Sequence, residues 1–158
     1  MRLAGKAVRR RYVVKSQYSI AAELASLGLA HDEFEQLQKD GPTPDVLASA
    51  KLLALLERTC WVELTRSVDP GHRVVGRSQY VRHRAPIPIG AVLAVDARCS
   101  SVNDTRIDWS VRAFVGSRLV ATAWLTFEVV SLEWPGAMES VRGSTDQSSI
   151  ALATQART

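Results

Sequence analysis

The segment that decides the fold runs Val46-Leu47-Ala48-Ser49-Ala50-Lys51-Leu52-Leu53-Ala54-Leu55-Leu56-Glu57-Arg58-Thr59-Cys60-Trp61-Val62-Glu63-Leu64. Its composition predicts one long helix that is apolar nearly all round, because its polar edge is narrow. That edge consists of Arg58, Thr59, Glu63 and Arg66. A helix with so little polar surface is typically buried, so we expect a sheet to cover it.

Turn and capping signals bound this helix on both sides. Either Asp45 or Ser49 can cap its N-terminus, and Asp69-Pro70-Gly71 is a strong turn signal after it. Asp40-Gly41-Pro42-Thr43-Pro44 breaks any helix before it. We therefore expect the helix to begin at residue 45 or 49 and to end before residue 69.

Glu57 is an acid within an apolar stripe of this helix. At about 100° per residue, a helix places five side chains within roughly 60° of it. They are Ala50, Leu53, Cys60, Trp61 and Leu64. We expect this stripe to face the core, where a carboxylate must find partners, become protonated or border a cavity. Acids placed in this way are candidate catalytic groups, and a structural pair with an arginine is the alternative.

Strand patterns fill the chain after this helix. They predict strands at 73–84, 91–102, 106–115 and 118–132, separated by a proline-rich break at 86–90, a turn at Asn103-Asp104 and a hairpin signal at Gly116-Ser117. Upstream, residues 8–14 are typical of a strand, and residues 19–27 and 31–39 of short helices. Residues 136–158 are rich in Ser, Thr, Gly and Gln, so we expect a disordered tail.

The length of 158 residues favours one domain, which we place at 1–135. No run of about 18 apolar residues predicts a membrane span. The N-terminus lacks the apolar core of a signal peptide, so we expect the cytoplasm. Cys60 and Cys99 follow no metal-ligand spacing and are expected to be reduced and buried.

The chain carries a net charge of +4. Its basic residues form one cluster at Arg9, Arg10 and Arg11 and a looser one at Arg73, Arg77, Arg82 and Arg84. No helix-turn-helix, zinc-finger or RNA-recognition signature accompanies them, so the charge indicates a preference for anions but no nucleic-acid partner. We expect most of these arginines to be solvated, with Arg82 and Arg84 pointing away from His83.

Together these elements predict an α+β protein in which an antiparallel sheet wraps around one long buried helix. This arrangement is the hotdog fold. Sheet edges of such folds often pair across a two-fold axis, so we expect a homodimer, with a tetramer left open.

Three side chains carry candidate chemistry. Ser49 precedes Glu57 by eight residues, which is about 12 Å along a helix axis. On an entering loop Ser49 would fold back toward the carboxylate, whereas a helix cap is its other role. His83 ends the first strand after the helix, beside irregular backbone where sites are common. A carboxylate, an imidazole and a hydroxyl supply the nucleophile or base, the proton donor and the orienting group of acyl transfer.

The chain resembles the fluoroacetyl-CoA thioesterase family of hotdog enzymes over roughly residues 42–130. That family has a Thr or Ser, a Glu eight residues later and a His twenty-six residues after the Glu, and Ser49, Glu57 and His83 keep both intervals. Gly76 and Gly90 are also in place. The other matching positions are Ala48, Leu55, Leu56, Cys60, Asp69-Pro70-Gly71, Val81, Arg82, Pro88 and Ile89.

The resemblance implies hydrolysis of an acyl-CoA or acyl-carrier thioester by a homodimer with two interface sites, without a metal or redox cofactor. Glu57 would be the nucleophile or activate water, His83 would polarise or protonate, and Ser49 would hydrogen-bond the reacting groups. Gly76 would let the thioester carbonyl approach the strand. Lys51 departs from the family pattern, and it would meet a substrate carboxylate or a phosphate, or extend to water. Residues 15–45 would cover the pocket.

Two other functions use similar groups. A hotdog hydratase or dehydratase would move protons on a CoA or carrier thioester without releasing thiol. A non-catalytic acyl-CoA-binding module would bind the thioester without turnover.

Overall fold

The computed structural model describes residues 3–28, 36, 41 and 44–131. Its elements are β1 (Ala7–Val13), the short 3-10 helix η1 (Ser16–Tyr18), α1 (Ile20–Ser26), α3 (Ser49–Thr65), β2 (His72–His83), β3 (Val92–Asn103), β4 (Arg106–Val115) and β5 (Arg118–Ser131). The tail expected at 136–158 and, apart from residue 36, the helix expected at 31–39 lie outside the described residues. The five predicted strands are confirmed, with bounds that differ by one or two residues at most.

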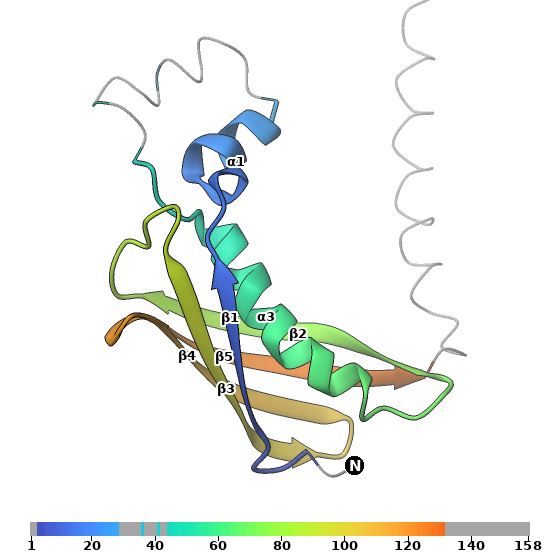
Figure 1. The fold of residues 1–158 in the computed structure, drawn as a ribbon. Helices are drawn as coiled ribbons and strands as arrows, with labels where there is room; N and C mark the ends of the chain where they lie inside the picture. Colours follow the sequence, from blue (N-terminus) through green and yellow to red (C-terminus); the bar gives the residue numbers. More distant parts are fainter. Residues whose placement is uncertain (1–2, 29–35, 37–40, 42–43, 132–158) are drawn as a thin grey trace, which may run out of the picture.

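The five strands form one antiparallel sheet in the order β1-β3-β4-β5-β2, and α3 lies across one face of it (Figure 1). This arrangement confirms the predicted α+β hotdog fold. β1 and β2 are the edge strands, so the outer edge of β2 pairs with no other strand in the described part of the chain.

The core lies between α3 and the sheet. The helix contributes Leu52, Leu55, Leu56, Thr59, Cys60, Glu63 and Leu64. The sheet contributes large side chains from its central strands, among them Leu93, Val95, Ile107, Trp109, Val111 and Leu125. Both cysteines are free and buried, as predicted.

The predicted division of α3 into apolar and polar sides is wrong in part, because only one face of the helix packs on the sheet. Thr59 is fully buried and Glu63 is 8% exposed, although both were expected on the polar edge. Conversely, Ala50 is exposed and Trp61 is 51% exposed, although both were expected to face the core. The stripe around Glu57 therefore lies at the border of the buried face, not at its centre.

Specific partners hold the two polar residues of this buried face. The Thr59 hydroxyl donates to the Leu55 carbonyl at 2.9 Å and lies 2.9 Å from the Tyr12 hydroxyl. The Lys6 ammonium contacts the Glu63 carboxylate at 2.6 Å. Burial of polar groups is tolerated when they are paired in this way, and both contacts attach the β1 region to the helix.

The predicted cap of the long helix is also wrong. The N-cap residue is Ala48, no side chain closes the first turn, and Ser49 is the first helical residue. Backbone bonds fix this entry instead: Leu47 N donates to Ile87 O at 2.9 Å, and Ala48 N donates to Tyr18 O at 2.8 Å. The start of α3 is thus anchored to the loop that follows β2.

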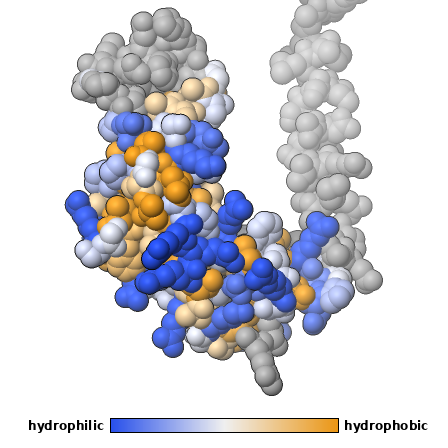
Figure 2. Space-filling view, in the orientation of Figure 1, coloured by the Kyte–Doolittle hydropathy of each residue, from blue (hydrophilic) through white to orange (hydrophobic). Residues whose placement is uncertain are grey.

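Hydrophilic and hydrophobic residues share the face seen in Figure 2, with a hydrophobic area toward α1 and hydrophilic residues over the middle of the molecule. Within the described residues, no helix combines the length and the apolar composition that a membrane crossing requires.

Candidate active site

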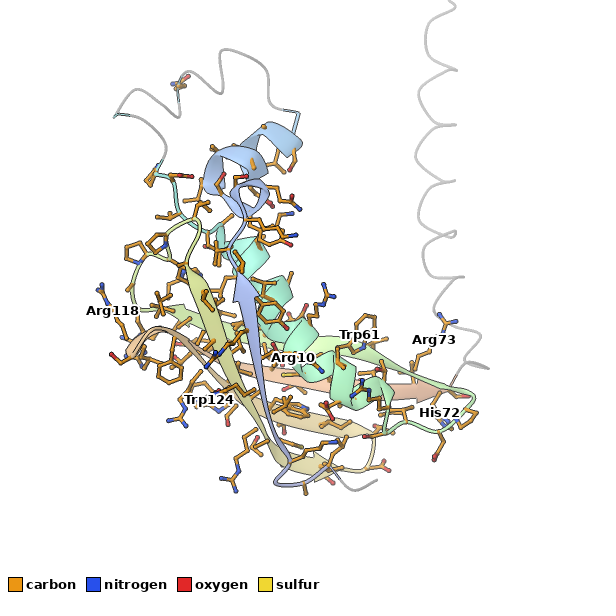
Figure 3. The ribbon with its side chains drawn as sticks, in the orientation of Figure 1. Arg10, Trp61, His72, Arg73, Arg118 and Trp124 are labelled. Atoms are coloured by element: carbon orange, nitrogen blue, oxygen red, sulfur yellow. The ribbon has the colours of Figure 1, made fainter. Side chains whose placement is uncertain are left out.

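A hollow of about 540 Å³ lies where α3 faces β2. Its lining residues are Ala54, Glu57, Arg58, Trp61, Val62, Val74, Gly76 and Phe127. Trp61 projects from α3 and is half-exposed, whereas the equally exposed Trp124 belongs to β5 (Figure 3). Glu57 is the one acid of this lining, which makes the hollow the natural candidate site.

Glu57 is half-buried and meets β2 at two points. Its Oε1 accepts a hydrogen bond of 2.9 Å from Gln79 Nε2. A Cβ atom on Gly76 would lie 3.3 Å from the same oxygen. The expectation that this acid finds a partner or borders a cavity is confirmed in both respects. The partner is a neutral amide, and no described arginine forms an ion pair with the carboxylate.

Cys60 lies beside the acid but is no rival nucleophile. Burial raises the pKa of the Cys60 thiol far above its ordinary value, and the negative charge of Glu57 raises it further. A thiol in such surroundings stays protonated and packs as a small apolar side chain.

A bulge in β2 decides which side chains face the helix. Gly76 pairs with Phe127 and Ser78 with Thr126, so Arg77 is an extra residue in the strand. Directly opposite residues of antiparallel strands share a face. Gly76, Gln79 and His83 therefore all lie on the helix side, opposite Phe127, Leu125 and Ala121. Without the extra residue, normal alternation would send Gln79 and His83 to the other face.

His83 faces the helix side, but it does not reach Glu57 in the same chain. It follows Gly76 by seven positions on the strand, which corresponds to roughly 20 Å at about 3.3 Å per residue. Its side chain is exposed at the end of β2. One chain therefore does not bring the carboxylate and the imidazole together.

Ser49 also stands apart from Glu57 within one chain. As the first residue of α3 it is exposed and lies about 12 Å from Glu57 along the helix axis. It does not fold back toward the carboxylate. Lys51, two residues further along the helix, contacts Glu23 of α1 at 3.2 Å. This ion pair attaches α1 to the start of α3.

Two features of the site were not predicted from the sequence. Gln79 carries no pattern that separates it from an ordinary exposed residue of an edge strand, since only the bulge turns it inward. Trp61 was expected in the core and instead forms a wall of the hollow.

Within the described ranges, no three His, Cys, Asp or Glu side chains gather closely enough to hold a metal ion.

The family model described as fluoroacetyl-CoA-specific thioesterase matches residues 31–133 of the chain. A curated fluoroacetyl-CoA thioesterase of Streptantibioticus cattleyicolor is 29% identical over 90 residues, which are 57% of this chain. The match spans 65% of the length of that relative.

Solved structures share the fold. A fluoroacetyl-CoA thioesterase has a TM-score of 0.73 at 24% identity, with 92% of this chain and 98% of that chain covered. A variant of the same enzyme in complex with fluoroacetate and CoA has a TM-score of 0.70 at 24% identity, covering 84% and 98%. A thioesterase superfamily member from Thermus thermophilus has a TM-score of 0.65 at 17% identity, covering 83% and 87%.

Proposed function

Since the chain belongs to the family of fluoroacetyl-CoA-specific thioesterases, we propose that it hydrolyses an acyl-CoA thioester at Glu57. The observation that carries the proposal is the position of this acid: it is half-buried, it borders a mostly apolar hollow, and one of its oxygens lies close to the backbone of Gly76. The similar structure that holds fluoroacetate and CoA supports a CoA thioester as the ligand. An acyl-carrier protein presents the same thioester group, so an acyl-carrier thioester is the other candidate substrate.

In the proposed reaction, the oxygen of water forms a bond to the acyl carbon and the carbon–sulfur bond breaks. Glu57 either takes the proton of the attacking water or attacks the carbonyl itself, in which case water opens the resulting anhydride. An imidazole polarises the carbonyl or protonates the departing thiolate. The products are a carboxylic acid and free coenzyme A, and the reaction requires no metal or redox cofactor.

A homodimer would supply the imidazole that a single chain keeps away from Glu57. β2 is an edge strand, and pairing with a second copy satisfies its free backbone groups. If two copies pair antiparallel about Tyr80, Ser78 comes opposite Arg82 of the partner subunit, and both face away from the helix. Because Arg77 is the extra residue of the bulge, Gly76 then comes opposite the partner's His83, and both face the helix side.

The same pairing gives Ser49 a role from the partner subunit. The start of α3 is bonded to the loop after β2, so Ser49 lies toward the His83 end of its own chain. We therefore propose that each site combines Glu57 of one subunit with the partner's His83 and the partner's Ser49. Lys51 is engaged with Glu23, which supports a role in attaching α1 to the start of α3.

Thiol release from acyl-CoA substrates tests the proposal. The unmodified protein is expected to release coenzyme A, and Glu57→Gln, which keeps the size of the side chain, is expected to lower the rate by about 10²–10⁴-fold. Glu128→Gln changes an acid of β5 outside the hollow and serves as the matched control. A change in the acyl double bond without thiol would favour the hydratase, and binding without turnover would favour the binding module.

A further inference from the structure

The hollow beside Glu57 is larger than a thioester carbonyl and a short acyl group require. In the single chain this hollow is open on one side, and its volume of about 540 Å³ falls in the range of ligand-binding clefts. Building on the proposed thioesterase activity, we propose that this hollow is the acyl-group site and that it selects a medium-chain or aryl-substituted apolar acyl group.

The walls have the chemistry of such a group. Five of the eight lining residues are apolar: Ala54, Trp61, Val62, Val74 and Phe127. The pantetheine arm of coenzyme A carries two amides, and among these side chains only the Trp61 indole N–H can hydrogen-bond them, so an arm placed here would lose the hydration of its amides with little compensation. An apolar acyl chain avoids this cost, and each methylene it buries strengthens binding about fourfold.

The positions of these side chains give the acyl chain a direction. Glu57 and Gly76 mark the carbonyl end, because the carboxylate oxygen lies beside the glycine there, where no Cβ atom stands between them. Trp61 follows Glu57 by one turn, about 6 Å along α3, and Val74 precedes Gly76 by a similar distance along β2. Phe127, paired with Gly76 and only 3% exposed, forms the floor. An acyl chain that starts at Glu57 would therefore run between Trp61 and Val74.

The charges of the lining argue against an anionic acyl group. The Glu57 carboxylate lies within the hollow, and it repels a second carboxylate brought in by a dicarboxylic substrate. Arg58 is the cation that would favour such a substrate, but it is exposed on the helix, where water already solvates its guanidinium. We therefore infer that the hollow binds an apolar acyl group and not a dicarboxylic one.

A substrate series on the unmodified protein tests this selectivity. Thiol release is measured with acetyl-CoA, hexanoyl-CoA, phenylacetyl-CoA and succinyl-CoA. We expect kcat/KM for the hexanoyl and phenylacetyl substrates to exceed that for acetyl-CoA at least tenfold, with succinyl-CoA lowest. Equal or faster hydrolysis of acetyl-CoA or succinyl-CoA would overturn the acyl-site proposal alone. No thiol from any of the four would overturn the proposed hydrolysis itself.

A variant that fills the hollow gives a second, independent readout. Ala54 is exposed on α3 and lines the hollow, so Ala54→Phe occupies the acyl site while leaving the core intact. The ratio of hexanoyl to acetyl kcat/KM should fall at least tenfold. Ala7→Phe, at an exposed alanine of β1 on the opposite edge of the sheet from β2 and outside the lining, is the matched control and should keep the ratio. Trp61→Ala removes a wall and should also lower the ratio. An unchanged ratio in both hollow variants would contradict the proposal.

Discussion

Gln79 Nε2 donates a hydrogen bond of 2.9 Å to Glu57 Oε1 and so joins the edge strand β2 to the middle of α3. A neutral amide fixes the position of one carboxylate oxygen without cancelling the charge, which an arginine in the same place would do. Among the described residues, no hydrogen bond engages Oε2, so this oxygen remains available for water or substrate. The bond thus leaves Glu57 both oriented and reactive.

Replacing Gln79 by glutamate should move the pH dependence of hydrolysis. Two carboxylates at hydrogen-bond distance repel each other, so both are ionised only at higher pH than one alone. If ionised Glu57 is the base or nucleophile, the acid limb of the kcat/KM profile of Gln79→Glu should shift upward by about one pH unit or more. The measurement is thiol release between pH 4 and pH 9, with the thermal midpoint recorded to confirm the fold.

Gln79→Met is the matched control for this shift. It keeps the length of the side chain but removes the hydrogen bond and adds no charge. We expect a lower kcat and a smaller upward shift of the acid limb than in Gln79→Glu, because losing one hydrogen-bond donor disfavours an ionised carboxylate less than a second negative charge does. Equal profiles for Gln79→Glu and the unmodified protein would contradict a catalytic role for the Glu57 charge.

Gly76→Ala should impair hydrolysis while the protein stays folded. The added methyl would lie 2.9 Å from Gln79 Nε2 and 3.3 Å from Glu57 Oε1. The end of the glutamine side chain can move, so the cost in stability should stay below about 1 kcal/mol, and the restricted unfolded chain offsets part of it. The displaced amide no longer holds Glu57, and the methyl occupies space beside its oxygen. We expect kcat/KM to fall roughly tenfold or more.

Gly90→Ala is the comparison variant for this glycine. Gly90 has a positive φ of 85°, and a Cβ atom added to it would have nothing within 4 Å, so an alanine there strains the backbone without touching the hollow. It should lower the thermal midpoint and leave kcat/KM nearly unchanged. The reverse pattern, with Gly76→Ala fully active, would remove the close approach at Gly76 from the mechanism.

Periodicity predicted the elements of this fold well, because long apolar and alternating stretches carry strong signals. A hairpin from Arg106 to Ser131 that follows a long buried helix is compatible with few folds other than the one observed. The family resemblance likewise singled out Glu57 and Gly76, which the structure places beside each other. The prediction of the fold succeeded because it depends on local pattern, which one chain contains in full.

The failures depend on contacts that no local pattern encodes. Thr59 and Glu63 look like a polar edge, yet Tyr12 and Lys6 from the first strand region bury them. Gln79 was missed because the bulge at Arg77 reverses the alternation of β2. A glycine within a strand, such as Gly76, is compatible with a bulge, but the sequence does not give the position of the extra residue, which decides which side chains reach the acid.

Glu63 should make the fold sensitive to acid. The Lys6 hydrogen bond, with smaller effects of Arg66 and Arg10, holds the pKa of Glu63 below its ordinary value, although burial opposes this. A carboxyl group with a lowered pKa stabilises the fold above its unfolded pKa of about 4.3, and this contribution disappears as the pH falls through the lower folded-state pKa. Glu63→Gln should therefore cost about 1–3 kcal/mol at pH 7.

Urea unfolding at pH 7 and near pH 3 checks this linkage. The difference in unfolding free energy between Glu63→Gln and the unmodified protein should be large at pH 7 and shrink at the lower pH. Asp69→Asn is the control, since this exposed acid of the turn after α3 forms no ion pair among the described residues. An equal difference at both pH values would show that the charge of Glu63 does not stabilise the fold.

Mixed dimers give the sharpest test of a site shared between subunits. Glu57→Gln and His83→Ala each remove one group, and each variant alone should have almost no activity. If a site combines Glu57 of one subunit with the partner's His83, a heterodimer of the two variants contains one intact site. After random exchange of subunits, the mixture should recover about a quarter of the unmodified activity, because half of the dimers are mixed and each has one working site of two.

If both groups instead acted within one chain, no dimer in the mixture would contain an intact site. Mixing Glu57→Gln with a Glu57→Gln, His83→Ala double variant is the control, since every site then lacks the acid. No recovery in the first mixture, with exchange verified by a size-tagged subunit, would refute the shared site.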